Sequence, residues 1–363
     1  MSEGKLKTAM LGLNEGGQLL LEAAKGVDYF QIHAVADKDT NLAEGIAAEC
    51  QCAAYDDYRQ LIMEMDSGPG AENRCLLVAE GMHSCDEYVR LAMKRKFNVL
   101  KLAPAARNFE EAAEFVRLGE DENVTFAIAN PSRFARSFLA LREFLQQGRI
   151  EQIFLMSAFC SVDEHPQFSW QTDPKLAGGG VLLHNCYRII DQMVANFGIP
   201  QQVYCLNTNQ AQDKQQRLYL TEDTTVVTMK FSDTLIGNLI ASRRTGMGPR
   251  EEFLRLYGKD KILTVNNTQL AVSDGLSQVS EELEYDDDQL FCMTEQLKNF
   301  ALSILLPDEN KLCSSSRENL KDMAVIESAY LSARTGFPEE PSRILQMASR
   351  GASWPVGTKP ARK

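Results

Sequence analysis

The chain has 363 residues, of which 44% are hydrophobic and 24% charged, and its formal net charge is -12. The length predicts two domains, the composition is typical of a soluble globular protein, and no apolar run approaches the roughly 20 residues of a membrane span. The negative charge disfavours nucleic acid and anionic membranes as partners, because their phosphates repel it.

The N-terminus and the cysteines indicate a reducing compartment. The first residues, MSEGKLKTAMLGL, run into a strand-like segment without the long apolar stretch and cleavage site of a secretory signal, so we expect a cytoplasmic protein. The nine scattered cysteines are interpreted as reduced thiols. None of the four histidines has a Cys or His partner at ligand spacing, so we predict no metal site.

From Lys7 to Ala129, short apolar runs alternate with amphipathic helical patterns. This order is typical of βαβ units around a parallel sheet. The expected strands are Thr8–Leu13, Ile32–Ala36, Cys75–Ala79, Asn98–Leu102 and Val124–Ala127. The expected helices are Gly17–Lys25, Leu42–Cys50, Asp57–Met65, Asp86–Lys94 and Phe109–Leu118. We therefore predict an α/β fold whose N-terminal domain, residues 1–130, is a doubly wound Rossmann sheet.

Residues 131–337 are predicted to form a second, α+β domain. After a helix over Phe134–Gln147, strand-like runs are joined by short turns, which indicates a large, mostly antiparallel open sheet. The expected strands are Ile153–Cys160, Val203–Thr208, Thr224–Phe231, Leu235–Ser242, Glu252–Tyr257 and Lys261–Val265. Helices over Gln289–Leu305 and Arg317–Ala333 are expected to pack back on the first domain. The acidic residues 281–288 are predicted to be a solvated loop and helix start, and residues 338–363 a loosely ordered tail.

The segment GLNEGG, Gly12–Gly17, follows the first expected strand and opens the first expected helix. Tight turning there lets the helix N-terminus face a pyrophosphate, although Asn14 replaces the middle glycine of the usual fingerprint. Asp37 ends the second strand 20 residues past Gly17, where a carboxylate accepts hydrogen bonds from an adenosine ribose. We predict NAD as the cofactor, while Lys38 beside Asp37 leaves NADP open. The alternative is a nucleotide-type fold that has lost its ligand.

Two longer segments resemble one protein family. The stretch WQTDPKLAGGGVLLHNCYRIID, Trp170–Asp191, is similar to the family's W-R-x-D-P-x-x-x-G-G-G-x-L-x-D-x-G-x-H-x-x-D motif, and AVIESAYLSARTG, Ala324–Gly336, is similar to its closing helix. On these motifs the chain resembles the glucose-fructose oxidoreductase / inositol dehydrogenase (Gfo/Idh/MocA) family from about Lys7 to Phe337. The resemblance implies a Rossmann domain, an open-sheet domain often used for oligomerisation, and NAD(P)-linked chemistry on sugars, cyclitols and related alcohols.

The chain departs from the family's pattern where the chemistry is expected. The family's Glu-Lys-Pro after the fifth strand, whose lysine lies beside the nicotinamide, falls on Leu102–Pro104, with Ala103 in place of the lysine. Its Asp and His after the triple glycine fall on His184 and Arg188, and its substrate-contacting arginine falls on Gln171. The resemblance therefore implies a divergent member without the usual lysine and histidine.

The remaining candidates for proton transfer are His184, Tyr187 and Lys101. On one helix, His184 and Arg188 would lie a turn apart and face the same cleft, and the guanidinium would lower the imidazole pKa. We expect His184 to act as acid/base and Arg188, which stays protonated, to position substrate. The alternative is a packed or capping histidine. The candidate substrate-binding residues are Arg188, Trp170, Gln171 and Asp191. The candidate cofactor-binding residues are Gly12, Asn14, Glu15, Gly16, Gly17, Asp37, Lys38, Ala79, Glu80 and Pro104.

Three classes of function fit these patterns. The leading interpretation is an NAD(P)-dependent oxidoreductase that acts on a sugar, cyclitol or related small alcohol or carbonyl compound. The alternatives are a catalytically degenerate sensor or partner subunit that binds a dinucleotide or sugar, and a structural oligomer with an empty cleft. An open sheet also favours a homodimer or homotetramer assembled by face packing through the C-terminal sheet.

Overall fold

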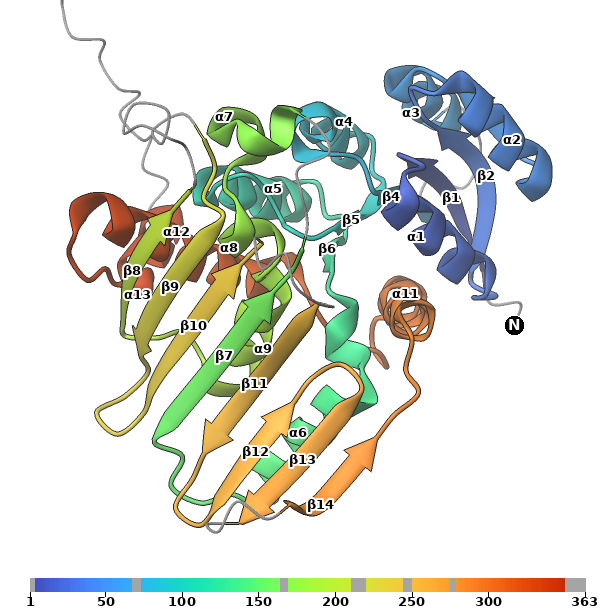
Figure 1. The fold of residues 1–363 in the computed structure, drawn as a ribbon. Coiled ribbons are helices and arrows are strands. Elements are labelled where there is room, and N and C mark those ends of the chain that lie inside the picture. Colours follow the sequence, from blue (N-terminus) through green and yellow to red (C-terminus); the bar gives the residue numbers. More distant parts are fainter. Residues whose placement is uncertain are drawn as a thin grey trace, which may run out of the picture.

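The structure, a computed structural model, describes residues 4–66, 73–163, 169–209, 220–243, 250–274 and 279–349. Two sheets organise the chain, a smaller one in the N-terminal half and a larger open one beside it (Figure 1). The first is a parallel, Rossmann-type sheet and the second is mostly antiparallel, which confirms the predicted fold class.

The first sheet has six parallel strands in the order β3-β2-β1-β4-β5-β6. The strands are β1 Leu6–Leu11, β2 Phe30–Ala36, β3 Ala53–Tyr55, β4 Arg74–Val78, β5 Asn98–Leu102 and β6 Phe126–Ala129. The helices between them are α1 Glu15–Lys25, α2 Thr40–Cys50, α3 Tyr58–Asp66, α4 Met82–Lys94 and α5 Phe109–Asp121. Strand β3 was not predicted, because its three residues are too few to show a strand pattern.

Alternate residues of β1 enter two different cores. Ala9 and Leu11 pack in one core with α3, α4 and α5, whereas Leu6 and Met10 pack in another with α1 and with α11, Gln289–Leu305. Helices thus cover both faces of the sheet, as parallel strands with nearly continuous apolar sequence require. Helix α11 comes from the far end of the chain and packs on α1, so a late helix completes the first sheet.

The chain crosses to the second sheet through a 3₁₀ turn, η2 Pro131–Phe134, and helix α6, Arg136–Gln146. The second sheet has eight strands in the order β14-β13-β12-β11-β7-β10-β9-β8, antiparallel except between β7 and β10. The strands are β7 Leu155–Ser161, β8 Gln202–Thr208, β9 Thr224–Lys230, β10 Ile236–Ser242, β11 Glu251–Tyr257, β12 Lys261–Val265, β13 Gln269–Asp274 and β14 Val279–Glu284. The other helical segments are η3 Ser169–Thr172, α7 Pro174–Ala177, α8 Val181–His184, α9 Tyr187–Phe197, α12 Ser316–Thr335 and α13 Pro341–Ser349.

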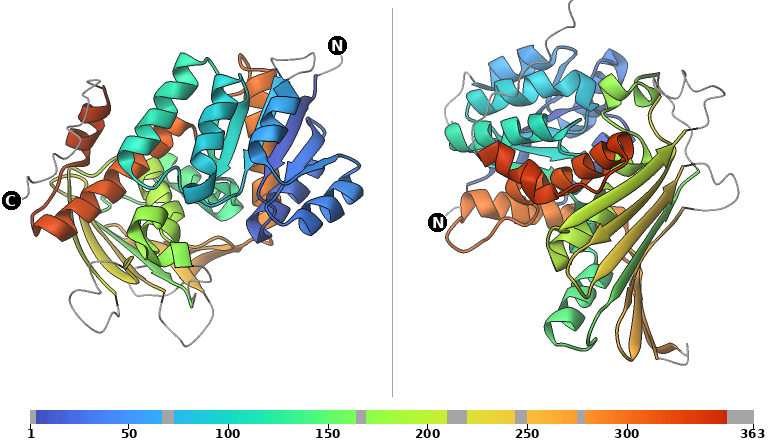
Figure 2. Two further views of the ribbon diagram at one scale, coloured as in Figure 1. Left: turned by 90° about the horizontal axis from the view of Figure 1, so that it is seen from above. Right: turned by 90° about the vertical axis from the view of Figure 1, so that its left-hand side faces the viewer.

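Helices lie on one face of the second sheet, and its other face is open (Figure 2). The strands alternate accordingly, because successive side chains point to opposite faces. Met229 and Leu239 are buried on the helix side, whereas Leu206, Val226 and Ile240 point outward and are 60%, 41% and 42% exposed. Strands β8, β9 and β10 therefore present apolar side chains on a surface that no described helix covers.

Two predictions for the C-terminal part were wrong. The acidic residues 281–288 were expected to be a solvated loop and helix start, but 281–284 belong to the edge strand β14, whose charged side chains point to solvent as edge strands commonly allow. Residues 285–288 do form a loop, and Asp288 caps the start of α11. The segment from 338, expected to be loose, pairs Glu339 with Val203 and continues as helix α13 against α12 as far as 349. Pro341 begins that helix with a preset φ, and Ile344 is buried against the core. Residues 350–363 of the predicted tail lie outside the described residues.

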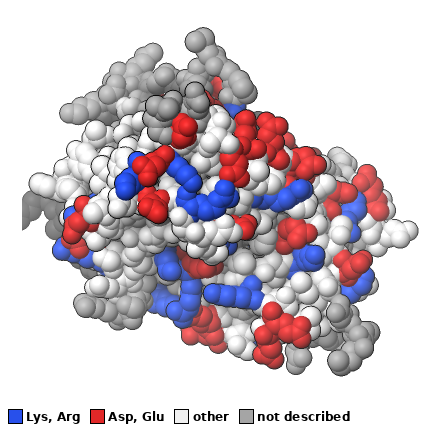
Figure 3. All heavy atoms as spheres, turned by 90° about the horizontal axis from the view of Figure 1, so that it is seen from below, with Lys and Arg blue, Asp and Glu red and all other residues white. Residues whose placement is uncertain are grey.

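On the face drawn in Figure 3, basic and acidic side chains are intermingled rather than gathered by sign. None of the helices in the described ranges combines the length and the hydropathy needed to cross a bilayer. Within the same ranges, no group of three or more His, Cys, Asp or Glu residues is arranged to hold a metal ion.

Candidate active site

The turn between β1 and α1 brings the backbone of three segments together. Gly12 has φ +84°, and a Cβ there would lie 2.8 Å from the amide nitrogen of Glu80. A Cβ on Gly17 would lie 2.2 Å from the Gly12 carbonyl oxygen. Both positions therefore require glycine, one for backbone conformation and close approach and the other for packing of helix on strand.

Asn14 caps the first helix in place of the usual glycine. Its Oδ1 accepts a hydrogen bond from the Gly17 amide at 3.0 Å, and its Nδ2 donates to the Ala79 carbonyl at 2.7 Å. The side chain therefore links the start of α1 to the segment that follows β4, and it occupies the Gly17 amide. In the described structure, the amides of Glu15 and Gly16 make no hydrogen bond within the chain, as expected for a first helical turn.

Asp37 is tied to the same turn. Its Oδ2 accepts from the Leu13 amide at 2.7 Å, and its Oδ1 accepts from the Asp39 amide at 2.9 Å. Each oxygen retains a second lone pair for a ligand hydroxyl. Lys38 lies beside it, where its ammonium donates to the Asp56 carbonyl at 3.2 Å and lies 4.7 Å from the ring centroid of Tyr58.

A second carboxylate lies at the end of β4. Glu80 accepts from the hydroxyl of Tyr58 at 2.7 Å and from the Gly81 amide at 2.8 Å. Burial, and then the carboxylates of Glu80 and Asp37, raise the pKa of Tyr58 far above its usual range, so Tyr58 acts as a hydrogen-bond donor at every accessible pH. The predicted cofactor residues at the ends of β1, β2 and β4 are thus brought together.

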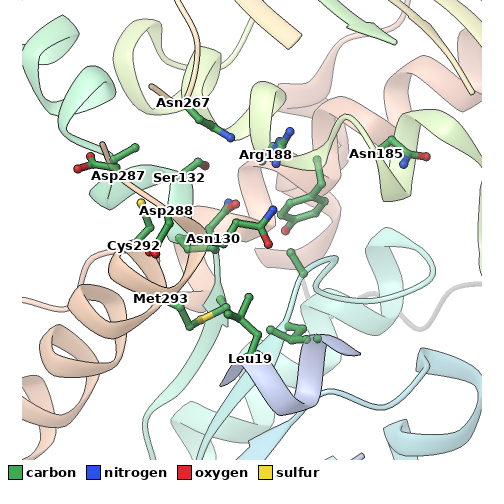
Figure 4. A pocket seen from close by; sticks show the side chains of 18 of the residues that line it. Leu19, Asn130, Ser132, Asn185, Arg188, Asn267, Asp287, Asp288, Cys292 and Met293 are labelled. Carbon is green, nitrogen blue, oxygen red and sulfur yellow. The ribbon is translucent and has the colours of Figure 1, made fainter. Parts of the chain in front are cut away.

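A cavity of about 280 Å³ opens beside the start of α1. Its walls come from both halves of the chain: α1, the ends of β5 and β6, η2, the α8–α9 region, the β12–β13 turn and the start of α11. Figure 4 shows Asn130, Ser132, Arg188 and Asn267 around one side and Leu19 and Met293 on the other. Of the predicted site residues, the cavity is lined by Gly16, His184, Tyr187 and Arg188.

His184 and Arg188 do not share a helix as predicted. Helix α8 ends at His184 and α9 begins at Tyr187, because Asn185 and Cys186 both donate to the Val181 carbonyl and close the turn. Both side chains nevertheless line the cavity.

His184 is held in one tautomer. Its Nε2 lies 3.0 Å from the Ala177 carbonyl oxygen, which can only accept, so Nε2 carries the proton. Nδ1 is then an acceptor, for which the described residues supply no hydrogen-bond donor. Burial, and to a smaller extent the charge of Arg243, lower the pKa of His184 to about 4. The predicted direction of the pKa shift is confirmed, but the contributing guanidinium is that of Arg243 and not that of Arg188.

Arg188 is bound within the protein. Its Nε lies 2.7 and 2.8 Å from the two carboxylate oxygens of Glu252, and its Nη2 also contacts that carboxylate. Arg250 approaches the same carboxylate at 3.5 Å. The positive charge expected to position substrate is therefore largely balanced by Glu252.

The other two proton-transfer candidates are engaged elsewhere. Tyr187 donates its hydroxyl to Asn319 Oδ1 at 3.0 Å, and burial raises its pKa well above the usual value. Lys101 is 1% exposed and lies on the opposite side of β5, with its ammonium 3.0 Å from Asp86 and 3.2 Å from the Ala105 carbonyl. Lys101 does not line the cavity, so its geometry is that of a buried structural ion pair.

The remaining predicted substrate and cofactor residues lie outside the cavity wall. Trp170 stacks on His83 at a centroid distance of 4.6 Å and lies 6.3 Å from the His184 ring. Gln171 accepts from Thr221 through its carbonyl oxygen. Pro104 is buried after Ala103, and Ala103 itself reaches the cavity.

The triple glycine has a packing role. A Cβ on Gly178 would lie 2.3 Å from the Arg107 carbonyl, one on Gly179 would lie 2.0 Å from the Tyr330 hydroxyl, and one on Gly180 would lie 1.8 Å from the Glu222 carbonyl. The Glu222 carboxylate accepts from the Gly180 and Leu182 amides at 2.8 and 3.0 Å and so caps α8. These contacts place His184 at the cavity.

A buried cluster of charged side chains, centred on Arg133 and Asp191, lies behind the part of the cavity wall formed by Tyr187. Arg133 binds both carboxylate oxygens of Asp191, one at 2.7 Å from Nε, and reaches Glu318 at 3.1 Å. Asp191 and Asp322 are both 0% exposed. Asp191, predicted to bind substrate, therefore joins η2 to α9 inside the protein.

Sequence reasoning missed several cavity residues. Asn130 follows β6, Ser132 lies in η2, Asn267 lies in the β12–β13 turn, and Asp287 precedes α11. Each reads as an ordinary turn or capping residue, because these side chains favour turns whatever their function. The triple-glycine motif drew attention to α8 and α9 instead.

Two comparisons of the sequence with known proteins give matches. A family model described as GFO/IDH/MocA C-terminal domain matches residues 138–264. An uncharacterized oxidoreductase of Schizosaccharomyces pombe is 24% identical over 208 residues, 54% of this chain and 54% of its own length, so the match spans about half of that relative.

Solved structures share the fold over nearly the whole chain. A levoglucosan dehydrogenase bound to NADH and levoglucosan has a TM-score of 0.81 at 15% identity and covers 93% of this chain and 99% of its own. An Agrobacterium radiobacter oxidoreductase bound to NAD+, L-tartaric acid and magnesium has a TM-score of 0.77 at 17% identity, covering 94% and 99%. A dehydrogenase of Bordetella pertussis bound to NADH and UDP-GlcNAcA has a TM-score of 0.76 at 15% identity, covering 93% and 98%.

Proposed function

We propose that this chain belongs to the Gfo/Idh/MocA family along its whole length and is an NAD-dependent oxidoreductase of a sugar, cyclitol or related small alcohol or carbonyl compound. One observation carries the proposal. The amides of Glu15 and Gly16 at the start of α1 make no hydrogen bond among the described residues, and Gly16 lines the cavity between the two halves of the chain. A dinucleotide held by its pyrophosphate at that helix would extend its nicotinamide end into the cavity. The solved relatives named above hold NAD+ or NADH.

The residues at the turn fit an adenine dinucleotide. Glycine at 12 leaves room for close backbone approach, and the Glu15 and Gly16 amides supply donors for a pyrophosphate. Asp37 can accept from the adenosine ribose hydroxyls with the lone pairs that its amide contacts leave. A 2′-phosphate would meet the carboxylates of Asp37 and Glu80, while Lys38 is held by Asp56 and Tyr58, so NAD is favoured over NADP.

A bound nicotinamide cofactor would supply the hydride chemistry, and the residues of this chain would have to bind the substrate hydroxyl and move its proton. His184 lines the cavity, its Nδ1 has no donor among the described residues, and its low pKa keeps it neutral above about pH 4, so Nδ1 is our candidate acceptor for the substrate hydroxyl. We assign it the acid/base position, with Ala103 leaving space where the family carries lysine. The chain is in this respect a divergent member.

The outward face of β8, β9 and β10 suits a partner subunit. Leu206, Val226 and Ile240 are exposed there without a covering helix. We propose a homodimer or homotetramer formed by this face, since contiguous exposed apolar surface marks association sites. Light scattering of wild type and of Ile240→Glu should show an oligomer that dissociates in the variant.

Titration of the protein with NADH, followed by nicotinamide fluorescence, tests the proposal. Asp37→Asn should weaken NADH binding because a neutral amide is a poorer acceptor for the ribose hydroxyls, whereas Asp28→Asn, at an exposed turn, should leave it unchanged. Absence of NADH and NAD affinity in wild type would refute the assignment. Binding without turnover of any sugar, cyclitol or related alcohol would instead support a dinucleotide sensor.

A further inference from the structure

We propose that a second cavity, between helices α5, α12 and α13, binds a small organic anion, namely a carboxylate or phosphate group attached to an apolar body. The second cavity has a volume of about 600 Å³, which lies within the range of about 300–1,000 Å³ typical of small-ligand sites. Among the described residues, none that lines it also lines the cavity beside α1. The inference therefore concerns a separate site and goes beyond the proposed function.

Three helices form the walls of the second cavity. Helix α12 packs against both α5 and α13, and Figure 1 shows these helices together on the side of the first sheet remote from α1 and α2. Each helix contributes an aliphatic side chain to the wall, from Val116, Leu320 and Leu345 respectively. Val116 is buried and the two leucines are half-buried, so an apolar ligand body in contact with them would be removed from water.

Two cations in the wall have no acidic partner among the described residues. Arg117 of α5 and Lys321 of α12 both line the second cavity, and neither makes an ion pair within those residues. The guanidinium of Arg117 contacts only the Ala113 carbonyl of its own helix, at 3.4 Å. Both side chains are exposed, so they are available to a ligand without breaking a contact between helices.

The acidic residues of the wall are already engaged. Glu120 forms an ion pair with Arg317 at 2.5 Å, and Glu318 is bound by Arg133, behind the wall, at 3.1 Å. Three cations therefore line the second cavity against two carboxylates, in a chain whose formal net charge is -12. This local excess of positive charge favours an anion and disfavours a cation.

The juxtaposition of unpaired cations and an aliphatic wall specifies the class of ligand. Arg117 and Lys321 would bind the anionic head from two neighbouring helices, while the apolar body would cover the aliphatic side chains. Carboxylate and phosphate share this chemistry, since the oxygens of both accept charge-assisted hydrogen bonds from guanidinium and ammonium groups. Because the two cations are exposed, each should contribute only about two- to fivefold to the affinity, and the apolar contact supplies the rest.

The experiment uses the full chain and probes that share one hexyl-type body: hexanoate, hexyl phosphate, 1-hexanol and hexylammonium. Acetate and inorganic phosphate supply the head groups without the apolar body. Binding is measured by calorimetric titration at constant ionic strength. We expect hexanoate or hexyl phosphate to bind more tightly than the neutral, cationic and short probes, and the tighter of the two identifies the head group. Failure of both to bind, or equally tight binding of 1-hexanol or hexylammonium, would overturn the inference.

Charge-removing variants test the location. Arg117→Gln and Lys321→Gln should each weaken the tighter anion about two- to fivefold and leave the melting temperature without ligand unchanged, because neither cation makes an ion pair among the described residues. Lys311→Gln, which removes an exposed cation outside the wall, is the matched control and should leave the affinity unchanged. Saturating NADH should not displace the anion, since the two cavities share no described lining residue. Displacement by NADH, or wild-type affinity in both variants, would reject the site.

Discussion

Replacing Asp322 by asparagine tests the buried acid pair behind the cavity. Arg133 supplies one positive charge to three carboxyl groups, those of Asp191, Asp322 and Glu318. Asp322 is 0% exposed, and neither of its oxygens accepts a hydrogen bond from the described residues. Burial, and then repulsion from Asp191, raise the pKa of Asp322 well above its usual range. Since Asp191 is bound to Arg133 through both oxygens, we place the proton of the pair on Asp322.

The sign of the pH effect follows from that proton. An aspartate in the unfolded chain ionises at about pH 4, whereas folded Asp322 keeps its proton to higher pH, so the folded state binds one more proton in between. The free energy of unfolding of the wild type therefore falls by about 1.4 kcal/mol per pH unit from this group as pH rises toward the folded-state pKa. Asparagine has the same shape and no such proton, so the variant should gain stability over wild type by that slope.

Urea unfolding followed by circular dichroism, at several values between about pH 4 and about pH 8, measures this difference. Near pH 4 the two proteins should be about equally stable, and Asp322→Asn should become progressively more stable than wild type above it. Asp260→Asn, at an exposed turn, is the control and should show no such slope. A stability difference that stays constant with pH, or a variant less stable at neutral pH, would refute the shared-proton interpretation.

Three further predictions follow from the site geometry. Because the pKa of His184 in the free enzyme is about 4, the pH profile of kcat/KM should show no change from His184 ionisation between about pH 5.5 and about pH 8 and should decline only toward about pH 4. A decline in kcat/KM near pH 6.5 that disappears in His184→Asn would contradict this. Asn14→Gly should cost a few tenths of a kcal/mol in unfolding free energy by loss of the cap and should tighten NADH binding by releasing the Gly17 amide; weaker binding in a fluorescence titration would count against that reasoning. Gly180→Ala should prevent folding or lower the melting temperature strongly, because its Cβ would lie 1.8 Å from the Glu222 carbonyl oxygen. Gly45→Ala in α2, where a Cβ would have no atom within 4 Å, should instead stabilise the protein by roughly 0.5–1 kcal/mol. Similar melting temperatures for the two variants would disprove the packing role of Gly180.

The N-terminal half was predictable because its signals are local. The apolar run of β1, the turn at Gly12 and the start of α1 lie within a few consecutive residues, and Asp37 follows at a spacing set by one helix and one strand. Strand β14 gave a weak signal because it is the edge strand of its sheet, where exposed side chains such as Glu282 and Glu284 are compatible with a strand as well as with a loop.

The arrangement of the C-terminal half depends on contacts that the sequence does not reveal. The end of α8 and the position of His184 follow from Glu222, which binds the start of that helix from about 40 residues away. The sequence alone suggests that Arg188 is an unpaired cation, whereas in the structure it binds Glu252 on strand β11. Asn130 Nδ2 and Ser132 Oγ are distinguished from the side chains of ordinary turn residues only by lacking a hydrogen-bond partner among the described residues, which the sequence cannot show.

The same turn that carries the unpartnered polar groups is fixed from behind by the charge cluster. Ser132 precedes Arg133 in η2, and Arg133 is bound to Asp191 of α9 and to Glu318 of α12. Tyr187 of α9 lines the cavity and is held by Asn319 of α12. Because one buried network sets the positions of both η2 and α9, a change in that network should alter substrate binding as well as stability. Asp322→Asn, which preserves the shape of the network, should therefore leave substrate affinity intact, and Arg133→Met, which leaves the carboxylates uncompensated, should reduce both.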